Sequence, residues 1–286
     1  MNGNLQVSAE IAHSSKNDLV AQIDRSGNAG IIDATYRLDS VSLRTGYHDL
    51  DANFASLAQT TTAGLREWYV GADWAISPQI TYGIDVRDAV TRTAALGDTP
   101  SSQSSLQSLT NRFNYNVQTV PGLAFSVSDT RNKGKDALQN STLNDATQLV
   151  TSYTTAEWTA YALIGVGRSR NPLNDAADSN NRMWQVTVGR NLSNATAETP
   201  ADWSMSLQAT AGRQLQTLST TGAETRTSNA GINVTGTSRT YGNLSLGLQH
   251  QRSTQPISGT ANLTTNTLQL DWTKAFGQQL TIQAYA

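Results

Sequence analysis

The chain has 286 residues, no cysteine and a formal net charge of -2. Disulfides and thiolate chemistry are therefore excluded, and no basic surface for nucleic acid is indicated. Only 37% of the residues are hydrophobic and 15% are charged. This composition does not favour a large soluble core, and it suits a protein with a polar interior and an apolar outer band.

No run of about 18 apolar residues occurs, so we expect no transmembrane helix. A strand-like pattern begins directly after Gly3, without a signal peptide. We therefore expect a single domain over residues 1–286 that is excised from or processed out of a longer precursor.

Apolar residues alternate with polar ones along most of the chain, which predicts strands with one apolar and one polar face. In chain order, the predicted strands cover residues 5–11, 19–23, 32–38, 41–47, 68–76, 80–86, 109–117, 123–127, 147–153, 158–166, 184–188, 203–211, 230–234, 244–248, 268–272 and 280–284. Loops or turns are expected between them, including a turn over 14–18 and a short loop over 25–30.

The clearest unit is the hairpin over residues 65–88. Its first arm places Trp68, Val70 and Trp74 on one face, and its second arm resumes the alternation at Ile80 after a Ser-Pro-Gln turn. Each arm has about the length that crosses a bilayer as a tilted strand. The sixteen predicted strands are joined by connections that alternate between short and long, except for the link over 192–201, which is long for its place. This is the pattern of an antiparallel transmembrane β-barrel with short periplasmic turns and longer extracellular loops.

Aromatic residues on the apolar face cluster near the strand ends, as in the interfacial girdles of such barrels. We therefore predict a membrane-interface girdle made of Tyr36, Tyr47, Trp68, Trp74, Tyr115, Tyr153, Trp158, Trp184, Trp203 and Trp272.

Charged residues of both signs recur on the opposite face. An Arg or Lys pointing into lipid at mid-bilayer costs about 2–4 kcal/mol, so this face should meet water. The predicted pore-lining residues are Glu10, Asp33, Arg37, Arg44, Asp73, Asp85, Arg87, Arg112 and Asp271. Glycines on the same face, such as Gly71 and Gly83, are expected to keep the lumen open.

The sequence contains no visible active site. His48, with Asp49 and Asp51 beside it in sequence, is the only local candidate for a general base with an orienting acid. A solvated loop histidine is the favoured interpretation. We therefore expect no catalytic residue, no metal site and no cofactor, and a protein that is not an enzyme.

With these features, the chain resembles bacterial outer-membrane β-barrels of the sixteen-stranded class, including porins and the C-terminal barrel domains of exopolysaccharide-export proteins. The resemblance spans the whole chain and rests on alternation, girdles and loop rhythm. It implies localisation in the outer membrane of a Gram-negative bacterium and a role in transport or secretion.

Our hypothesis is an outer-membrane pore that passes a hydrophilic solute or a secreted polymer, such as an exopolysaccharide, through a polar lumen of mixed charge. The expected partners are outer-membrane lipid, the transported solute or polymer, and a periplasmic partner or N-terminal domain, but no nucleic acid. The alternatives are a non-conducting membrane anchor for a missing N-terminal region, a soluble secreted β-sandwich or adhesin, and an outer-membrane hydrolase.

Overall fold

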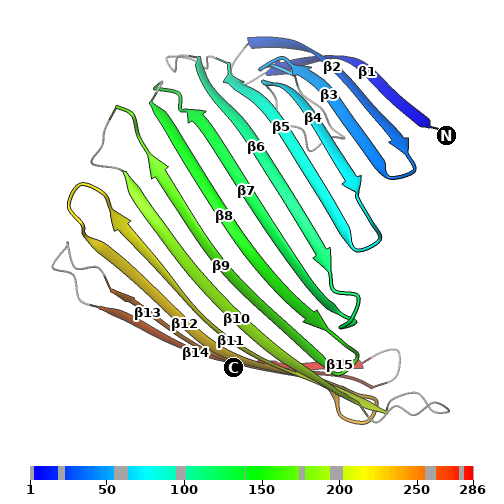
Figure 1. Ribbon diagram of the computed structural model, residues 1–286, viewed down its shortest axis with the longest axis vertical. Helices are drawn as coiled ribbons and strands as arrows, with labels where there is room; N and C mark the ends of the chain where they lie inside the picture. Colours follow the sequence, from blue (N-terminus) through cyan, green and yellow to red (C-terminus); the bar gives the residue numbers. More distant parts are fainter. Residues whose placement is uncertain are drawn as a thin grey trace. The chain divides into compact units, whose positions relative to one another are not determined.

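The computed structural model describes residues 3–18, 23–54, 64–94, 101–138, 140–173, 178–193, 202–254, 262–276 and 280–285. Within these residues the regular elements are fifteen β-strands, which hydrogen-bond to one another in chain order (Figure 1). No helix long and apolar enough to cross a membrane occurs in this described part of the chain.

The chain divides into two compact units. Unit 1 comprises Met1–Tyr115, Val127–Thr147 and Arg168–Asp178, and unit 2 comprises Asn116–Ser126, Gln148–Gly167 and Ser179–Ala286. The strands that lie mainly in unit 1 are β1 (Asn4–Asp18), β2 (Ile23–Leu38), β3 (Val41–Leu50), β4 (Leu65–Ala75), β5 (Ile80–Thr93) and β6 (Ser102–Asn116).

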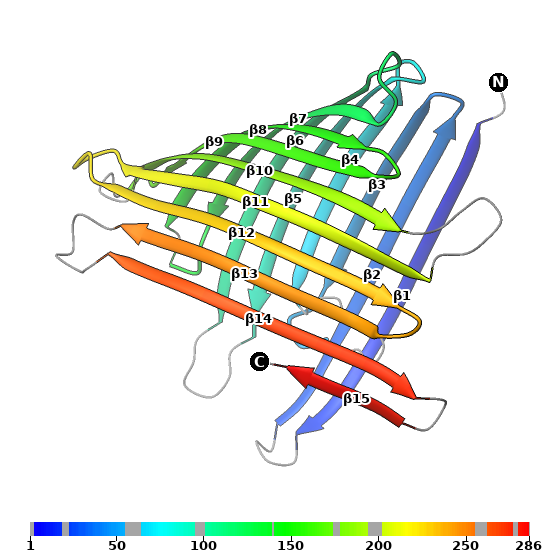
Figure 2. The same ribbon diagram turned by 90° about the horizontal axis from the view of Figure 1, so that it is seen from below.

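Three strands contribute to both units: β7 (Leu123–Lys135), β8 (Ser141–Thr154) and β9 (Trp158–Arg170). Unit 2 also contains β10 (Ser179–Ser193), β11 (Trp203–Leu218), β12 (Glu224–Ser238), β13 (Gly242–Thr254), β14 (Leu263–Phe276) and β15 (Leu280–Tyr285). Figure 2 shows β10 to β14 lying side by side, in agreement with their antiparallel registers.

The registers keep apolar residues level with apolar residues. In unit 1, Leu43 pairs with Ala72, which pairs with Ile84. In the adjacent row, Arg44 pairs with Gly71, which pairs with Asp85. Because successive side chains point to opposite faces, one face of the sheet is apolar and the other is polar, as the alternation predicts.

The exposure of these faces is the reverse of that in a soluble protein. Large apolar side chains are exposed along the strands, including Ile11 at 92% and Leu268 at 63%. By contrast, Glu67 on the polar face is only 8% exposed. A soluble sheet buries its large apolar side chains, whereas a lipid-facing sheet presents them outward. We call the apolar face the outward face.

The described residues contain fifteen strands, so the predicted sixteen are not confirmed. The predicted loop over 25–30 lies within β2, where Gly27 pairs with Ser14 of β1 and Gly30 pairs with Ile11. The predicted turn over 14–18 lies within β1. Pairing with a neighbouring strand outweighs the local turn preference of Gly and Asn here. Residues 19–22, part of the predicted strand 19–23, lie outside the described residues.

Most strands also extend beyond the predicted ends. β14 covers Leu263–Phe276, for example, where the apolar alternation predicts only 268–272. The alternation marks the segment that faces lipid, and the ladder of backbone hydrogen bonds continues past it. At the start of β13, Gly242 has φ 85°, a left-handed conformation that suits glycine after the short turn from β12.

Candidate pore-lining site

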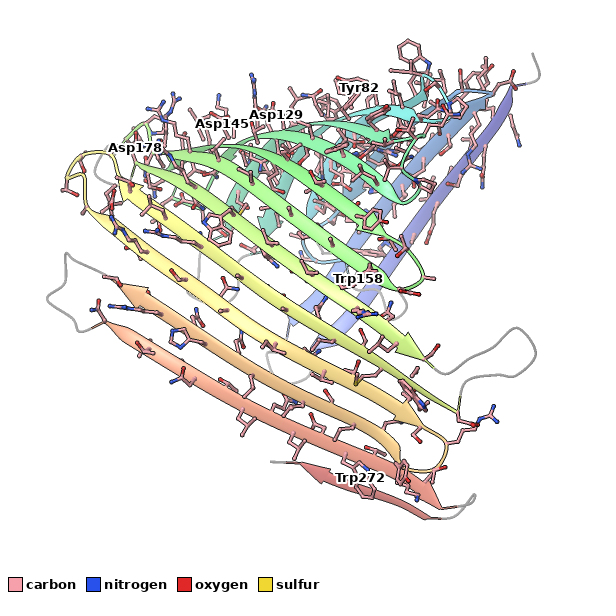
Figure 3. The ribbon with its side chains drawn as sticks, turned by 60° about the horizontal axis from the view of Figure 1, so that its bottom comes forward. Tyr82, Asp129, Asp145, Trp158, Asp178 and Trp272 are labelled. Atoms are coloured by element: carbon pink, nitrogen blue, oxygen red, sulfur yellow. The ribbon has the colours of Figure 1, made fainter. Side chains whose placement is uncertain are left out.

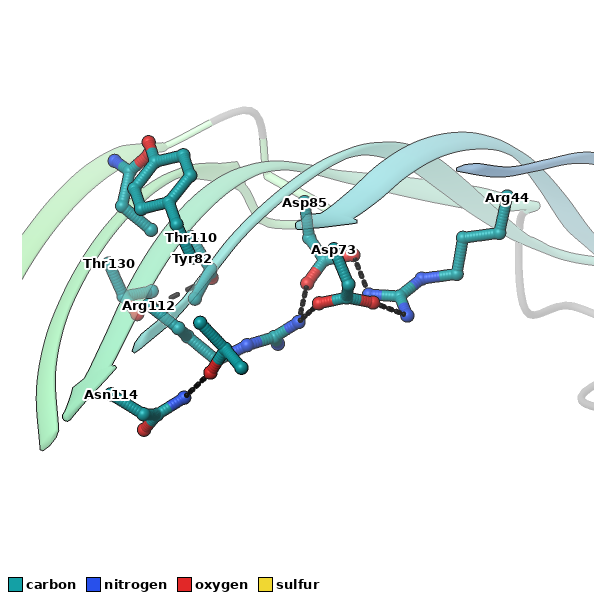
Figure 4. Close-up of polar contacts among 10 residues, drawn as sticks. Arg44, Asp73, Tyr82, Asp85, Thr110, Arg112, Asn114 and Thr130 are labelled. Atoms are coloured by element: carbon teal, nitrogen blue, oxygen red, sulfur yellow. Dashed lines mark hydrogen bonds and ion pairs between the residues drawn. The ribbon is translucent and has the colours of Figure 1, made fainter. Parts of the chain in front are cut away.

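The polar face of unit 1 contains a continuous network of two arginines and two aspartates on four neighbouring strands (Figure 4). Arg44 on β3 donates through Nη1 to Asp73 Oδ2 on β4, at 2.7 Å, and through Nη2 to Asp85 on β5. Arg112 on β6 donates through Nη2 to Asp85 Oδ2 at 2.6 Å and lies 3.3 Å from Asp73 Oδ1. Each carboxylate therefore contacts both guanidinium groups, and the formal charges of the network cancel.

Two glycines form the floor of this network. A Cβ atom at Gly71 would lie 2.6 Å from Arg44 Nε, and one at Gly83 would lie 2.6 Å from Asp73 Oδ1. Both glycines are buried beneath the charged side chains. These glycines leave room for long side chains to cross the strand, and the expectation that they keep a lumen open stays a prediction.

A second charged cluster lies on the same face, around His48 of β3. Its Nε2 is 2.9 Å from Asp33 Oδ1 on β2, and its Nδ1 is 2.9 Å from Glu67 Oε1 on β4. Tyr69 donates its hydroxyl to Asp33 Oδ1 at 2.6 Å, and Arg87 Nε donates to Glu67 Oε2 at 2.7 Å. With His48 neutral, the cluster carries one net negative charge; with His48 protonated, it carries none.

The exposure of the first network limits its contribution to stability. The side chains of Arg44, Asp73 and Asp85 are 36%, 44% and 28% exposed. Ion pairs this open to solvent contribute about 0–1 kcal/mol each to folding, because water already solvates both charges. The network is therefore better explained as a means of fixing charges at set places on the polar face than as a source of stability.

The structure brings together six of the nine predicted pore-lining residues: Asp33, Arg44, Asp73, Asp85, Arg87 and Arg112. Arg37 lies towards the short-turn end of unit 1, where it lines a cavity of ≈ 520 Å³ together with Asp73 and Thr81. Glu10 lies on β1, level with Ile31. Asp271 lies on β14 in unit 2, where it accepts a hydrogen bond from Gln269.

Sequence reasoning missed His48, Glu67 and Tyr69 as members of the site. The alternation in the sequence does assign all three residues to the polar face, because they fall on the polar positions of their strands. Proximity in sequence was misleading instead. Asp49 points away from His48 and accepts a hydrogen bond from Tyr47, while Asp51 accepts one from the backbone N–H of Asn28. The carboxylates that contact His48 come from other strands.

The polar face of unit 2 has a different chemistry. Amides, hydroxyls and glycine dominate the rows of β11 to β14, where they line a cavity of ≈ 370 Å³. The residues of this polar lining are Gln208, Thr210, Asn229, Gly231, Asn233, Ser245, Gly247, Gln249, Thr267 and Gln269. The polar surface is therefore charged in unit 1 and mostly neutral in unit 2.

The outward face carries the predicted girdle residues. Eight of them are substantially exposed: Tyr36, Tyr47, Trp68, Trp74, Tyr115, Trp158, Trp184 and Trp203. Tyr153 and Trp272 are half-buried. Trp272, near the end of β14 in Figure 3, donates its indole N–H to the carbonyl of Tyr241 at 2.9 Å.

The spacing of the tryptophans in unit 2 fits a membrane. Trp184 is level with Arg213 of β11, and Trp203 lies ten residues before Arg213 on the same strand. Ten strand residues span about 34 Å, which becomes about 26 Å along the membrane normal at the usual tilt of barrel strands. That height matches the roughly 25 Å apolar band of outer-membrane barrels. In unit 1, Trp68 and Trp74 lie only six residues apart on β4, about 20 Å along the strand.

In the described part of the chain, no group of three or more His, Cys, Asp and Glu side chains is arranged to hold a metal ion. The cluster around His48 holds only two carboxylates with the imidazole, and both carboxylates already accept hydrogen bonds from Tyr69 or Arg87.

No known protein family and no curated protein matches the sequence. Among solved structures, the chain is similar to a bacterial polysaccharide outer membrane secretin, with 12% identity, 92% of this chain and 94% of that chain covered, and a TM-score of 0.36. It is also similar to a loop L8 deletion mutant of OmpT, an outer membrane protein of Vibrio cholerae, with 9% identity, coverage of 92% and 98%, and a TM-score of 0.37.

The structure confirms the all-antiparallel β-strand part of the predicted outer-membrane β-barrel fold. The strands form one sheet with an exposed apolar face, and its closure into a barrel stays a prediction. The predicted localisation in the bacterial outer membrane stays a prediction.

The prediction that the chain is not an enzyme is wrong as a firm exclusion. The fold leaves enzymatic status unestablished, because one fold can host unrelated activities. The prediction also relied on His48 being a solvated loop residue. The structure places His48 within β3, with its side chain only 18% exposed and between two carboxylates.

Proposed function

We propose that the chain is an outer-membrane pore whose polar face lines a water-filled lumen. The observation that carries the proposal is the reversed exposure of the sheet. Apolar side chains such as Val70 and Ile232 are 50% and 48% exposed on one face, and charged or amide side chains cover the other. A lipid-facing band requires the first face, and an aqueous passage requires the second.

We further propose that residues 1–286 form one barrel domain, closed by pairing of β1 with β15. All odd-numbered strands of an antiparallel sheet run in the same direction, so this closing pair would be parallel. An odd strand number has a precedent in the nineteen-stranded mitochondrial barrel. A barrel of this size leaves an aqueous interior, whereas eight strands leave only enough room for side chains.

The proposed cargo is a hydrophilic solute or a secreted polymer. Balanced ion pairs in unit 1 give the lumen no net charge at Arg44, Asp73, Asp85 and Arg112. The amides and hydroxyls of unit 2 can donate and accept hydrogen bonds with a neutral polar molecule, such as a sugar chain. Both features support passive transport of neutral hydrophilic molecules over selection of ions by charge.

The alternative of a soluble β-sandwich requires a second sheet packed on the apolar face. All strands of the described residues belong to one sheet, which counts against that alternative. A membrane anchor closed by its own loops has the same outward face as a pore, so it differs from the proposal only in conductance.

Planar-bilayer recording tests the proposal. The refolded protein should insert and produce stepwise increases in current in potassium chloride. A folded, membrane-inserted protein that produces no steps would rule out the pore and leave the anchor.

A further inference from the structure

Four arginines form an array on the outward face of unit 2, at the long-loop ends of β10 to β13. They are Arg182, Arg213, Arg226 and Arg252, one on each strand, and all four are exposed. We call this set the arginine array. None of them belongs to the polar face or to the predicted pore lining.

The strand registers place the array in two adjacent rows. Arg213 and Arg252 are both level with Ser228 of β12, on the strands at either side of it. Arg182 and Arg226 are both level with Leu215 of β11, in the next row outward. Strands lie about 4.8 Å apart, so the Cα atoms of the two arginines in each row are about 10 Å apart.

The array lies where the apolar band ends. Trp184 is level with Arg213 and marks the membrane–water interface on this side. Two rows further into the band, Val188, Ile232 and Leu248 are 42–48% exposed. Arginines in this position lie at the depth of lipid headgroups, with their aliphatic stems along the apolar surface.

The charge of the array is largely uncompensated. Arg226 pairs with Glu224 on its own strand, with Nη2 at 2.5 Å from the carboxylate. Glu224 is the only acidic side chain on the outward face of β10–β14 among the described residues. Four guanidinium groups and one carboxylate leave a net positive charge at the surface of the bilayer.

The geometry points to a binding site for phosphorylated lipid headgroups, formed by the arginine array beside Trp184. Guanidinium groups bind phosphate oxygens in a bidentate manner. These charge-assisted hydrogen bonds become stronger where the lipid surface excludes water. In the orientation of outer-membrane barrels, long loops face the cell exterior, so the lipid would belong to the outer leaflet. This site requires a lipid-facing outward face, but it does not require that the pore conducts.

The test compares two double variants of the full chain in zwitterionic nanodiscs. Arg213→Gln/Arg252→Gln removes one row of the array. Arg190→Gln/Lys274→Gln removes the same charge from the outward face at the opposite ends of β10 and β14 and serves as the matched control. Binding of diphosphorylated lipid A is measured by native mass spectrometry, beside the same lipid without phosphates and inorganic phosphate alone.

The proposal predicts that the array variant binds diphosphorylated lipid A at least tenfold more weakly than the unmodified chain, with the control variant within twofold of it. The lipid without phosphates and inorganic phosphate should bind at least tenfold more weakly than the phosphorylated lipid. Equal loss in both variants, or equal binding of the lipid without phosphates, would overturn the proposal. Planar-bilayer conductance should be unchanged in the array variant, so failure of lipid binding remains distinct from failure of the pore.

Discussion

The guanidinium group of Arg44 on β3 crosses above Gly71 of β4 to contact Asp85 on β5. A side chain at Gly71 would occupy this path, because its Cβ would lie 2.6 Å from Arg44 Nε. The charged network therefore depends on a residue that carries no charge.

Gly71→Ala should displace Arg44 from Asp85 and lower the free energy of unfolding by about 1 kcal/mol or less, because the atoms that must move are ends of flexible side chains. The measurement is urea unfolding in lipid vesicles, combined with single-channel conductance. Gly247→Ala on β13 is the matched control, since its Cβ would meet its nearest neighbour at 3.9 Å. A change in conductance with Gly247→Ala but not with Gly71→Ala would contradict this explanation.

Removing one charge from the network should make the pore selective for ions. Arg44→Gln leaves Asp73 and Asp85 with only Arg112, so we expect the reversal potential in a potassium chloride gradient to shift towards that of potassium. Asp85→Asn should shift it towards that of chloride, and the combination of both changes should restore the original value. Two single variants with the same reversal potential as the unmodified chain would show that the network does not face the conducting path.

The loop after β7 should respond to acid through Asp136. Hydrogen bonds from the Asn140 side chain and from the backbone N–H groups of Asn140 and Leu138 hold the pKa of the Asp136 carboxyl below its ordinary value of 3.8. Because the pKa is lowered in the folded state, this contribution to loop stability is present above pH 3.8 and is lost as the pH falls through the lowered pKa. Hydrogen exchange at the Leu138 and Asn140 amides should therefore accelerate in strong acid relative to neighbouring strands. In Asp136→Asn, this acid dependence should be absent.

Closure of the sheet can be tested by cross-linking, because the chain has no cysteine of its own. One cysteine at Ile282 of β15, combined in turn with one at Val7, Ala9 or Ile11 of β1, should give a thiol-specific cross-link in at least one combination. Leu248→Cys with Leu268→Cys is the positive control, since these residues pair directly between β13 and β14. Cross-linking of the control alone would count against closure through β1 and β15.

The face of each strand could be predicted from the sequence, because strand periodicity alone determines it. This is why Arg44, Asp85 and Trp184 were assigned to the correct faces. The strand count could not be predicted, since Gly27 and Gly30 favour a turn locally but are held in β2 by pairing with β1.

The partners of His48 could not be predicted either. They lie on β2 and β4, and their identity depends on register, which a sequence of alternating residues does not specify between distant strands. The arginine array was missed for the same reason. Its successive members are 13 to 31 residues apart in sequence, and they come together only through the registers of β10 to β13.

The central claim is that one face of the sheet meets lipid and the other meets water. Ala209 and Thr210 are adjacent on β11, with Ala209 level with Val188 and Ile232 on the outward face and Thr210 on the cavity of the polar face. Single cysteines at these positions can be treated with a charged, water-soluble maleimide after the protein is inserted into lipid vesicles. The pore predicts rapid labelling of Thr210→Cys and protection of Ala209→Cys until detergent is added. Equal labelling at both positions, or protection of Thr210→Cys with labelling of Ala209→Cys, would contradict it.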